Sequence, residues 1–217
     1  GQPWDLDRLY GGVHTLPPYE QAKGTDWYKG TANAIYQNIS FIDSYDPEYV
    51  IILSGDQICK QDYADFLRFH KEKGAEFSVA VMEVDWKEAS RFGLMVADEN
   101  DRITEFQEKP PVPKSNLASM GIYIFNWDIL KKYLEEDEAD PNSKNDFGMN
   151  IIPALLRDGR KMYAYHFNGY WRDVGTIDSL WEANMEVLDP ENSGIDIFDE
   201  KWKIYSRNPV LPAQKIG

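Results

Sequence analysis

Basic residues and cysteine are both scarce in this sequence. Lysine and arginine together number 23 against 37 aspartates and glutamates, which gives a net charge of −14 at pH 7. Such a surface repels polyanions, so the charge argues against broad binding to nucleic acid or to anionic membranes. The single cysteine, Cys59, excludes an intrachain disulfide and a cysteine-based zinc site. If this acidic chain binds anionic small molecules, it needs local cations or metal ions.

Long apolar runs are absent as well. No run reaches the roughly 20 residues of a membrane-spanning helix, and the first residues contain no basic-then-apolar signal segment. A soluble, cytoplasmic protein is therefore the expectation. Hydrophobic residues make up 42 % of the 217 and aromatic residues 14 %, which is enough for one folded α/β domain.

The central part of the chain alternates between short apolar runs and helical patterns. Residues 50–53 are an unbroken, β-branched apolar run, residues 77–84 have the composition of a second buried strand, and a helical pattern over 62–73 lies between them. This order predicts a βαβ unit in a mostly parallel sheet. Further strands are predicted at 94–97, 102–108, 119–125 and 162–167, and helices at 127–134, 146–156 and 176–187.

The texture of the sequence changes at Pro190. Residues 195–217 carry short apolar stretches and two prolines but no helical period. This pattern indicates one α/β domain over 1–190, followed over 191–217 by a linker into a second, mostly β element.

Two aspartates follow predicted strands. Asp56 comes directly after Gly55 at the end of the run 50–53, and Asp173 precedes a helix that Thr176 can cap. Ligands of open parallel sheets gather at the carboxyl ends of the strands, and Mg²⁺ prefers carboxylate oxygens. Together the two acids could hold Mg²⁺ between phosphates. Taken singly, Gly-Asp is also an ordinary turn, and an acid at a helix start also suits the helix dipole.

Lys109 is the candidate for the cation that an acidic, phosphate-binding chain requires. It lies in Glu108-Lys109-Pro110 at the end of a predicted strand, where the proline keeps it extended. The alternative is that Glu108 and Lys109 form an ordinary solvent-exposed ion pair without a role in binding. Upstream, residues 27–32 (WYKGTA) combine a helix start suited to an anion with aromatics that wall a sugar or fill the core.

Six segments occur in order along the chain: WYKGTANA, VIILSGD, FGLMVADENDRITEFQEKP, LASMGIYIF, NDFGMNIIP and YWRDVGT. Segment by segment they resemble the bacterial ADP-glucose pyrophosphorylases of glycogen synthesis, over nearly the whole chain. EKP and WRDVGT also occur in related nucleotidylyltransferases, whereas WYKGTANA with ASMGIYIF points to the ADP-glucose branch. The resemblance implies an enzyme that forms ADP-glucose and pyrophosphate from ATP and glucose 1-phosphate.

The resemblance also implies a fold, an assembly and a site. The fold is a Rossmann-like nucleotidyltransferase domain followed by the start of a left-handed parallel β-helix, and the assembly is a homo-oligomer, a homotetramer in the family. Asp56 and Asp173 are implied to hold catalytic Mg²⁺, and Lys109 to bind the sugar phosphate. The glucose 1-phosphate site maps onto Tyr28, Gly93, Glu108, Lys109 and Ser119, with Asp146 and Trp171 in segments that line the same pocket.

The sequence departs from the family pattern in two ways. Gln57 and Cys59 stand where the family usually has His and Tyr; glutamine still donates and accepts hydrogen bonds, so Asp56 is expected to function. The family's glycine-rich GGxGxRLxPLT loop is not among the 217 residues, so we expect an N-terminally incomplete domain that is inactive alone. Two alternatives stay open: a UDP- or dTDP-sugar pyrophosphorylase, and a non-catalytic regulatory subunit of the same fold.

Overall fold

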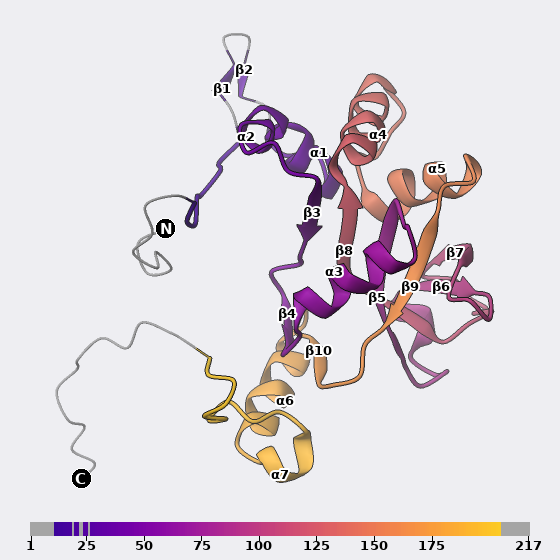
Figure 1. Ribbon diagram of the computed structural model, residues 1–217. Coiled ribbons are helices and arrows are strands. Elements are labelled where there is room, and N and C mark those ends of the chain that lie inside the picture. Colours follow the sequence, from indigo (N-terminus) through magenta and orange to yellow (C-terminus); the bar gives the residue numbers. More distant parts are fainter. Residues whose placement is uncertain (1–10, 19, 22–23, 26, 205–217) are drawn as a thin grey trace, which may run out of the picture.

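The computed structural model describes residues 11–18, 20–21, 24–25 and 27–204. Its centre is a six-stranded sheet (Figure 1). The strands of this sheet are β3 (Tyr49–Ile52), β5 (Phe77–Glu83), β6 (Gly93–Ala97), β7 (Ile103–Glu108), β8 (Leu117–Asn126) and β9 (Met162–His166). Two small two-stranded ribbons accompany it: β1 (Glu20–Gln21) with β2 (Gly24–Thr25), and β4 (Gln57–Cys59) with β10 (Trp171–Asp173).

Helices lie between the strands along the chain. They are α1 (Thr31–Tyr36), α2 (Ile39–Asp43), α3 (Tyr63–Glu72), the 3-10 turn η2 (Ala89–Arg91), α4 (Trp127–Ala139), the π-helical turn η3 (Phe147–Ile151), α5 (Ile152–Arg157), α6 (Ile177–Val187) and α7 (Pro190–Ser193). No helix of the described residues is long and apolar enough to cross a membrane.

The prediction of a mostly parallel sheet is wrong. Only β5 and β9 pair in parallel; every other pairing within the sheet is antiparallel. β3 and β5 run in the same direction, as a βαβ unit requires, but β8 lies between them and runs the opposite way. An apolar strand buried on both faces has the same sequence pattern whether its neighbour is parallel or antiparallel, so the pattern could not reveal the inserted β8.

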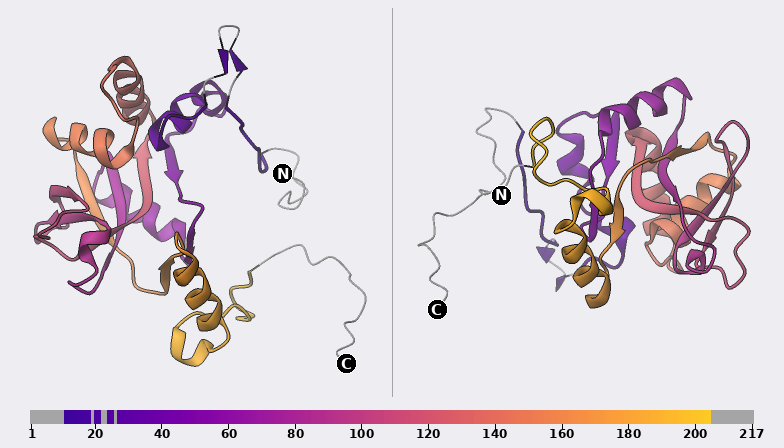
Figure 2. Two further views of the ribbon diagram at one scale, coloured as in Figure 1. Left: turned by 180° about the vertical axis from the view of Figure 1, so that it is seen from behind. Right: turned by 90° about the horizontal axis from the view of Figure 1, so that it is seen from below.

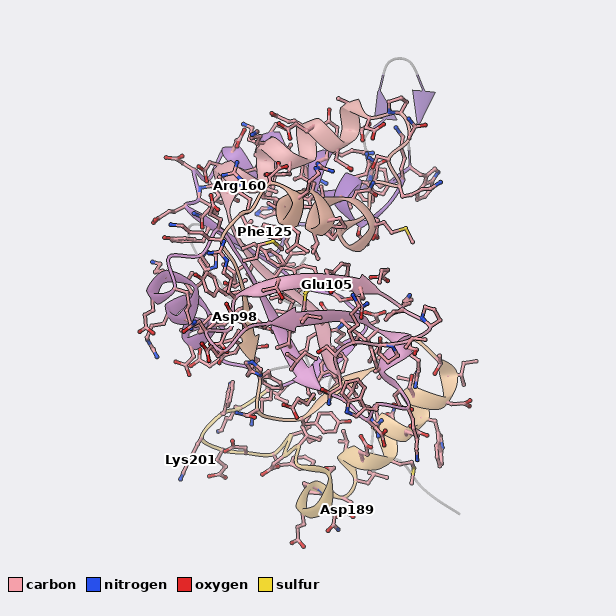
Figure 3. The ribbon with its side chains drawn as sticks, turned by 90° about the vertical axis from the view of Figure 1, so that its right-hand side faces the viewer. Asp98, Glu105, Phe125, Arg160, Asp189 and Lys201 are labelled. Carbon is pink, nitrogen blue, oxygen red and sulfur yellow. The ribbon has the colours of Figure 1, made fainter. Side chains whose placement is uncertain are left out.

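Both faces of the sheet are covered, and the side chains alternate between them. From β8, Phe125 packs with α4 and α5 in one cluster, while Met120 and Ile124 pack with Phe66 of α3 in another. The result is three layers, with helices on each side of the sheet (Figure 2). Figure 3 shows Phe125 in the interior, whereas Asp98, Asp189 and Lys201 lie at the surface.

A bulge in β8 shapes the side of the sheet where the candidate site lies. The register between β5 and β8 shifts from Val79↔Tyr123 to Val81↔Ser119. Gly121 sits in this irregularity with φ of +66°, a left-handed conformation that favours glycine. A side chain there would also approach Gln57, since a Cβ on Gly121 would lie 3.2 Å from its Nε2 atom.

Several predicted helix boundaries are confirmed. Asp62 caps α3 by accepting a hydrogen bond from the Ala64 backbone at 2.8 Å, and Thr176 caps α6 through a capping box with Ser179. The predicted helix 146–156 is present, but its first turn is π-helical and Asp146 caps it. In the predicted β-helix region, α7 and turns occupy the part up to residue 204, and no strand is present there; residues 205–217 lie outside the described part.

His70 provides a test of the core. It is fully buried on α3, with Nδ1 2.8 Å from the Ser78 hydroxyl and Nε2 2.9 Å from Oδ1 of Asn126. Burial lowers the pKa of His70 below its usual 6.5, an effect that the Asn126 bond opposes and Lys71 reinforces. The folded state therefore keeps the imidazole neutral at a pH where the unfolded chain protonates it.

The free energy of unfolding should accordingly fall as the pH drops below about 6.5, by at most about 1.4 kcal/mol per pH unit for this group. The loss begins at the unfolded pKa and ends at the lowered folded pKa. Urea unfolding at about pH 7.5 and 5.5 measures it. His70→Gln should reduce the acid loss, whereas His14→Gln should keep it; equal pH dependence in the two variants would contradict the assignment.

Candidate functional site

A cavity of about 480 Å³ opens where β3 ends, beside α1 and η3. The residues that line it come from segments that are far apart in the sequence. The lining residues are Thr31, Ala34, Ile35, Ile52, Leu53, Ser54, Gly55, Glu108, Gly121, Tyr123, Asp146, Phe147 and Gly148.

Glu108 is the carboxylate at which three segments meet. The register of β6 and β7 places it opposite Gly93, and a Cβ on Gly93 would lie 3.0 Å from Oε2 of Glu108. A Cβ on Gly148 would lie 2.7 Å from the same oxygen. A side chain on either glycine would therefore occupy space that the Glu108 carboxylate needs. Burial raises the pKa of Glu108; Lys109 opposes this effect and the charge of Asp146 adds to it.

Asp146 lies near Glu108, since a Cβ on Gly148 would lie 3.4 Å from its Oδ1, and hydrogen bonds fix its position. Its Oδ2 accepts from the Thr31 hydroxyl at 3.0 Å, and its Oδ1 accepts from the Met149 backbone at 3.0 Å. Thr31 is held there because Gly30 passes very close to the chain before η3, where a Cβ would lie only 2.4 Å from the Asn145 carbonyl oxygen. The start of α1 and the start of η3 thus form one unit around the Asp146 carboxylate.

Tyr123 completes the floor of the cavity. It projects from β8, and burial raises the pKa of its hydroxyl to about 12. A hydrogen bond with Ser119 opposes this shift, and the nearby charges of Glu108 and Asp146 add to it. Burial is the largest of these causes. The phenol therefore stays protonated at neutral pH and offers a hydrogen-bond donor.

Asp56 and Asp173 come together, although they are far apart in the sequence. β4 and β10 pair antiparallel, with Asp173 opposite Gln57, and the Val174 backbone donates to the Asp56 carbonyl at 2.9 Å. A Cβ on Gly175 would lie 3.0 Å from Oδ1 of Asp173 and 3.8 Å from Oδ2 of Asp56. The two carboxylates are thus neighbours, as expected, but on a separate ribbon rather than at the ends of parallel strands.

The surroundings of these two aspartates differ. Oδ1 of Asp56 accepts a hydrogen bond from the Ser54 hydroxyl, and Ser54 itself lines the cavity. Oδ1 of Asp173 accepts from the Gly175 backbone at 2.8 Å. Asp173 lines a second hollow of about 540 Å³, so the pair lies between the two cavities. The described residues contain no group of three or more His, Cys, Asp or Glu side chains that could hold a metal.

Lys109 extends from the end of β7 beside Glu108. Its side chain is 67 % exposed, and its Nζ lies 3.9 Å from Oε1 of Glu108. The residue has φ of +44°, in the left-handed region, so the prediction that Pro110 keeps Lys109 extended is wrong. Its backbone N–H donates to the Phe92 carbonyl at 3.2 Å. The ammonium group is thus mostly exposed, and its ion pair with Glu108 is long.

Three other predicted residues do not line the first cavity. Tyr28 is half-buried, and its hydroxyl donates to the Leu16 carbonyl at 2.6 Å. Ser119 lies two residues before Gly121 and accepts from its backbone at 3.2 Å. Trp171 lines the second hollow and donates from its indole to Gln57 at 3.3 Å.

The reasoning from sequence missed several lining residues. Tyr123, Gly121 and Gly148 all fall within the segments ASMGIYIF and NDFGMNIIP, but only the bulge in β8 and the close approach at η3 give them a role. The sequence places Thr31 only at a helix start. A glycine inside an apolar strand run was the one available signal for the bulge.

Comparison with known proteins agrees with this arrangement. Residues 6–190 match the protein-family model described as nucleotidyl transferase, so the chain belongs to the nucleotidyl transferase family. Among its curated relatives, the chain is 67 % identical over all 217 residues to the glucose-1-phosphate adenylyltransferase of Clostridium beijerinckii, and covers 56 % of that protein. It is 65 % identical to that of Clostridium acetobutylicum, covering 57 %, and 61 % identical to that of Desulforamulus reducens, covering 54 %. The chain thus spans a little over half the length of these relatives.

Proposed function

We propose that this chain is the catalytic region of a glucose-1-phosphate adenylyltransferase, which forms ADP-glucose and pyrophosphate from ATP and α-D-glucose 1-phosphate. The observation that carries the proposal is the cavity flanked by Glu108 and Asp146, beside the paired Asp56 and Asp173. The high identity to enzymes with that name supports it.

In this proposal the first cavity holds the sugar. The carboxylates of Glu108 and Asp146 accept hydrogen bonds from sugar hydroxyls, and the protonated Tyr123 donates one. Gly93 and Gly148 keep the space around Glu108 open. Lys109 supplies the cation for the sugar phosphate. Tyr28, Ser119 and Trp171 stay predictions from the resemblance.

Asp56 and Asp173 fit a Mg²⁺ site. Mg²⁺ prefers carboxylate oxygens and is commonly held by one or two carboxylates, with substrate phosphates and water as the other ligands. Two adjacent carboxylates agree with that donor set, and a closed protein cage is not needed. When bound, Mg²⁺ would supply charge neutralisation on the phosphates.

The chain's residues then have mainly positioning roles. A phosphate oxygen of glucose 1-phosphate attacks the α-phosphorus of ATP; a new P–O bond forms, and the bond to the leaving pyrophosphate breaks. Lys109 orients the attacking phosphate, and the two carboxylates of the cavity fix the glucose ring. The rate depends on geometry and charge rather than on a covalent step at the protein.

Two alternative functions can be distinguished by measuring which nucleotide is used and whether turnover occurs. A UDP- or dTDP-sugar pyrophosphorylase would share the sugar site but use UTP or dTTP. A regulatory subunit would share the fold without turnover; the presence of Asp56, Lys109 and Asp173 disfavours it. The homo-oligomer expected from the resemblance stays a prediction.

The proposal predicts saturable binding of glucose 1-phosphate to the 217-residue chain in calorimetry. Glu108→Gln should weaken it by about tenfold, which corresponds to about 1.4 kcal/mol. Glu105→Gln, on the same strand, should leave it unchanged, since Glu105 pairs with Lys114. In a protein of the relatives' full length, pyrophosphate release should prefer ATP. Preference for UTP or dTTP, or binding insensitive to Glu108→Gln, would overturn the assignment.

A further inference from the structure

Asn145, the residue directly before Asp146, is the one buried residue among the described non-glycine positions that have a positive φ. Its φ is +53° and its exposed fraction is 8 %, whereas Asp46, Asp101 and Lys109 are exposed or half-buried. The left-handed region is unfavourable for residues other than glycine, and asparagine tolerates it better than most. Such conformations persist only where the surroundings fix them, and they gather at functional sites. Asn145 does not itself line the first cavity.

The backbone of Asn145 joins two walls of that cavity. Its carbonyl oxygen accepts a hydrogen bond at 2.8 Å from the Ala32 backbone, in the first turn of α1, where the N–H groups have no partner within the helix. This bond holds α1 where the Thr31 hydroxyl donates to Asp146 and accepts from the Phe147 backbone at 3.2 Å. Thr31, Asp146 and Phe147 all line the cavity, so the backbone of Asn145 sets the place of three lining residues.

The side chain of Asn145 ties this backbone to the end of α4. Its Nδ2 donates to Oδ2 of Asp137 at 3.3 Å and to Oε2 of Glu138 at 3.2 Å. The backbone N–H of Asn145 donates to the Ser143 hydroxyl at 2.8 Å, and that hydroxyl donates to Asp137 at 2.6 Å. Carboxylates only accept hydrogen bonds, so an amide N–H₂ group suits this place and a third carboxylate does not.

Glu138 connects the same hydrogen bonds back to α1. Its Oε2 accepts from Nδ2 of Asn33 at 2.8 Å, and its Oε1 lies 3.2 Å from Nζ of Lys29. Asn33 is almost fully buried, with an exposed fraction of 2 %. The start of α1, the end of α4 and the start of η3 are therefore linked to one another around Asn145.

From this geometry we propose that Asn145 is a positioning residue of the glucose 1-phosphate site. It does not contact the sugar; its left-handed backbone and its bonds to α4 fix Asp146 and Thr31 in the arrangement that receives the sugar hydroxyls. Because these groups are already in place, binding carries little cost of ordering them. The inference rests on the proposed function, since it takes the first cavity as the sugar site.

The test is calorimetric titration of glucose 1-phosphate into the 217-residue chain and into its Asn145→Asp variant. Aspartate has nearly the same size and also tolerates the left-handed region, but its carboxylate would face Asp137 and Glu138. We expect about tenfold weaker binding at an unchanged number of sites, since displacement of a positioning group costs up to about 100-fold. Asn142→Asp is the matched control: it places the same charge at an exposed position of the same loop, and should keep the wild-type affinity.

The number of sites separates positioning from folding. If Asn145 served only the stability of the fold, Asn145→Asp would lower the fraction of molecules that bind and leave the affinity of the others unchanged. Asn145→Gly keeps the left-handed backbone and removes only the bonds to α4, so it should fold and bind about three- to tenfold more weakly. Asn145→Asp combined with Asp137→Asn restores an amide beside a carboxylate and should recover part of the affinity.

Three results would overturn the proposal: wild-type affinity in Asn145→Asp, a loss confined to the number of sites, or an equal loss of affinity in the Asn142→Asp control. The proposed function fails in a different way, by binding that Glu108→Gln does not weaken. Binding that Glu108→Gln weakens and Asn145→Asp leaves unchanged would keep the sugar site and remove the role assigned to Asn145.

Discussion

Asp56→Asn is expected to lower kcat by about 10²- to 10³-fold in a protein of the relatives' full length, with modest changes in KM. Asn keeps the size of the side chain and its hydrogen bond with Ser54, but removes the negative charge beside Asp173. A carboxylate that holds a cation against phosphates matters most where charge shifts between oxygens, which is in the transition state. Loss of that charge should therefore appear in turnover rather than in substrate binding.

Initial rates of pyrophosphate release at varied ATP and glucose 1-phosphate measure this effect. Asp128→Asn is the matched control, because Asp128 is an exposed aspartate in the first turn of α4 and lines neither of the two cavities beside Asp56 and Asp173. It should keep the normal rate. If Asp56→Asn retained near-normal kcat, Asp56 would not be an essential ligand, and the pairing with Asp173 would have only a structural meaning.

Much of this fold follows from local patterns that the sequence displays. The strand patterns around Val50 and Val79, the helical pattern over 62–73 and the cap residue Thr176 all predicted elements that the structure contains. These signals are local, since an apolar run or a cap depends on a few neighbouring residues. The strand order depends instead on contacts between distant segments, and there the prediction of a mostly parallel sheet was wrong.

The candidate site likewise contains residues that local sequence patterns predict and residues that only contacts between distant segments bring into it. Asp56, Glu108 and Asp173 are predicted because each follows or ends a predicted strand. Tyr123 is not, because an aromatic residue in a buried strand is usually part of the core. It lines the cavity together with Gly121, which lies in the register shift of β8, and a Cβ on Gly121 would lie 3.8 Å from the Cβ of Ser54. The short ribbon of β4 and β10 was likewise invisible, since three residues carry no clear period.

Lys109→Ala should raise the KM for glucose 1-phosphate by about ten- to a hundredfold while the KM for ATP changes little. A hydrogen bond to a charged group contributes about 1.5–3 kcal/mol, which corresponds to that range. The side chain is mostly exposed and its only ion pair within the described residues is the long one with Glu108, so removing it costs the fold little. The backbone N–H that donates to Phe92 remains, and alanine can keep the same conformation as lysine.

Two variants separate charge from position. Lys109→Arg should recover part of the affinity, because it keeps the charge but not the shape of the ammonium group. Lys114→Ala removes another exposed lysine that pairs with Glu105 near the end of the same hairpin, and should leave both KM values unchanged. Parallel increases in both KM values for Lys109→Ala would show a general disturbance of the site and remove the role assigned to this lysine. An increase confined to glucose 1-phosphate, with thermal stability unchanged, would place its phosphate beside Lys109.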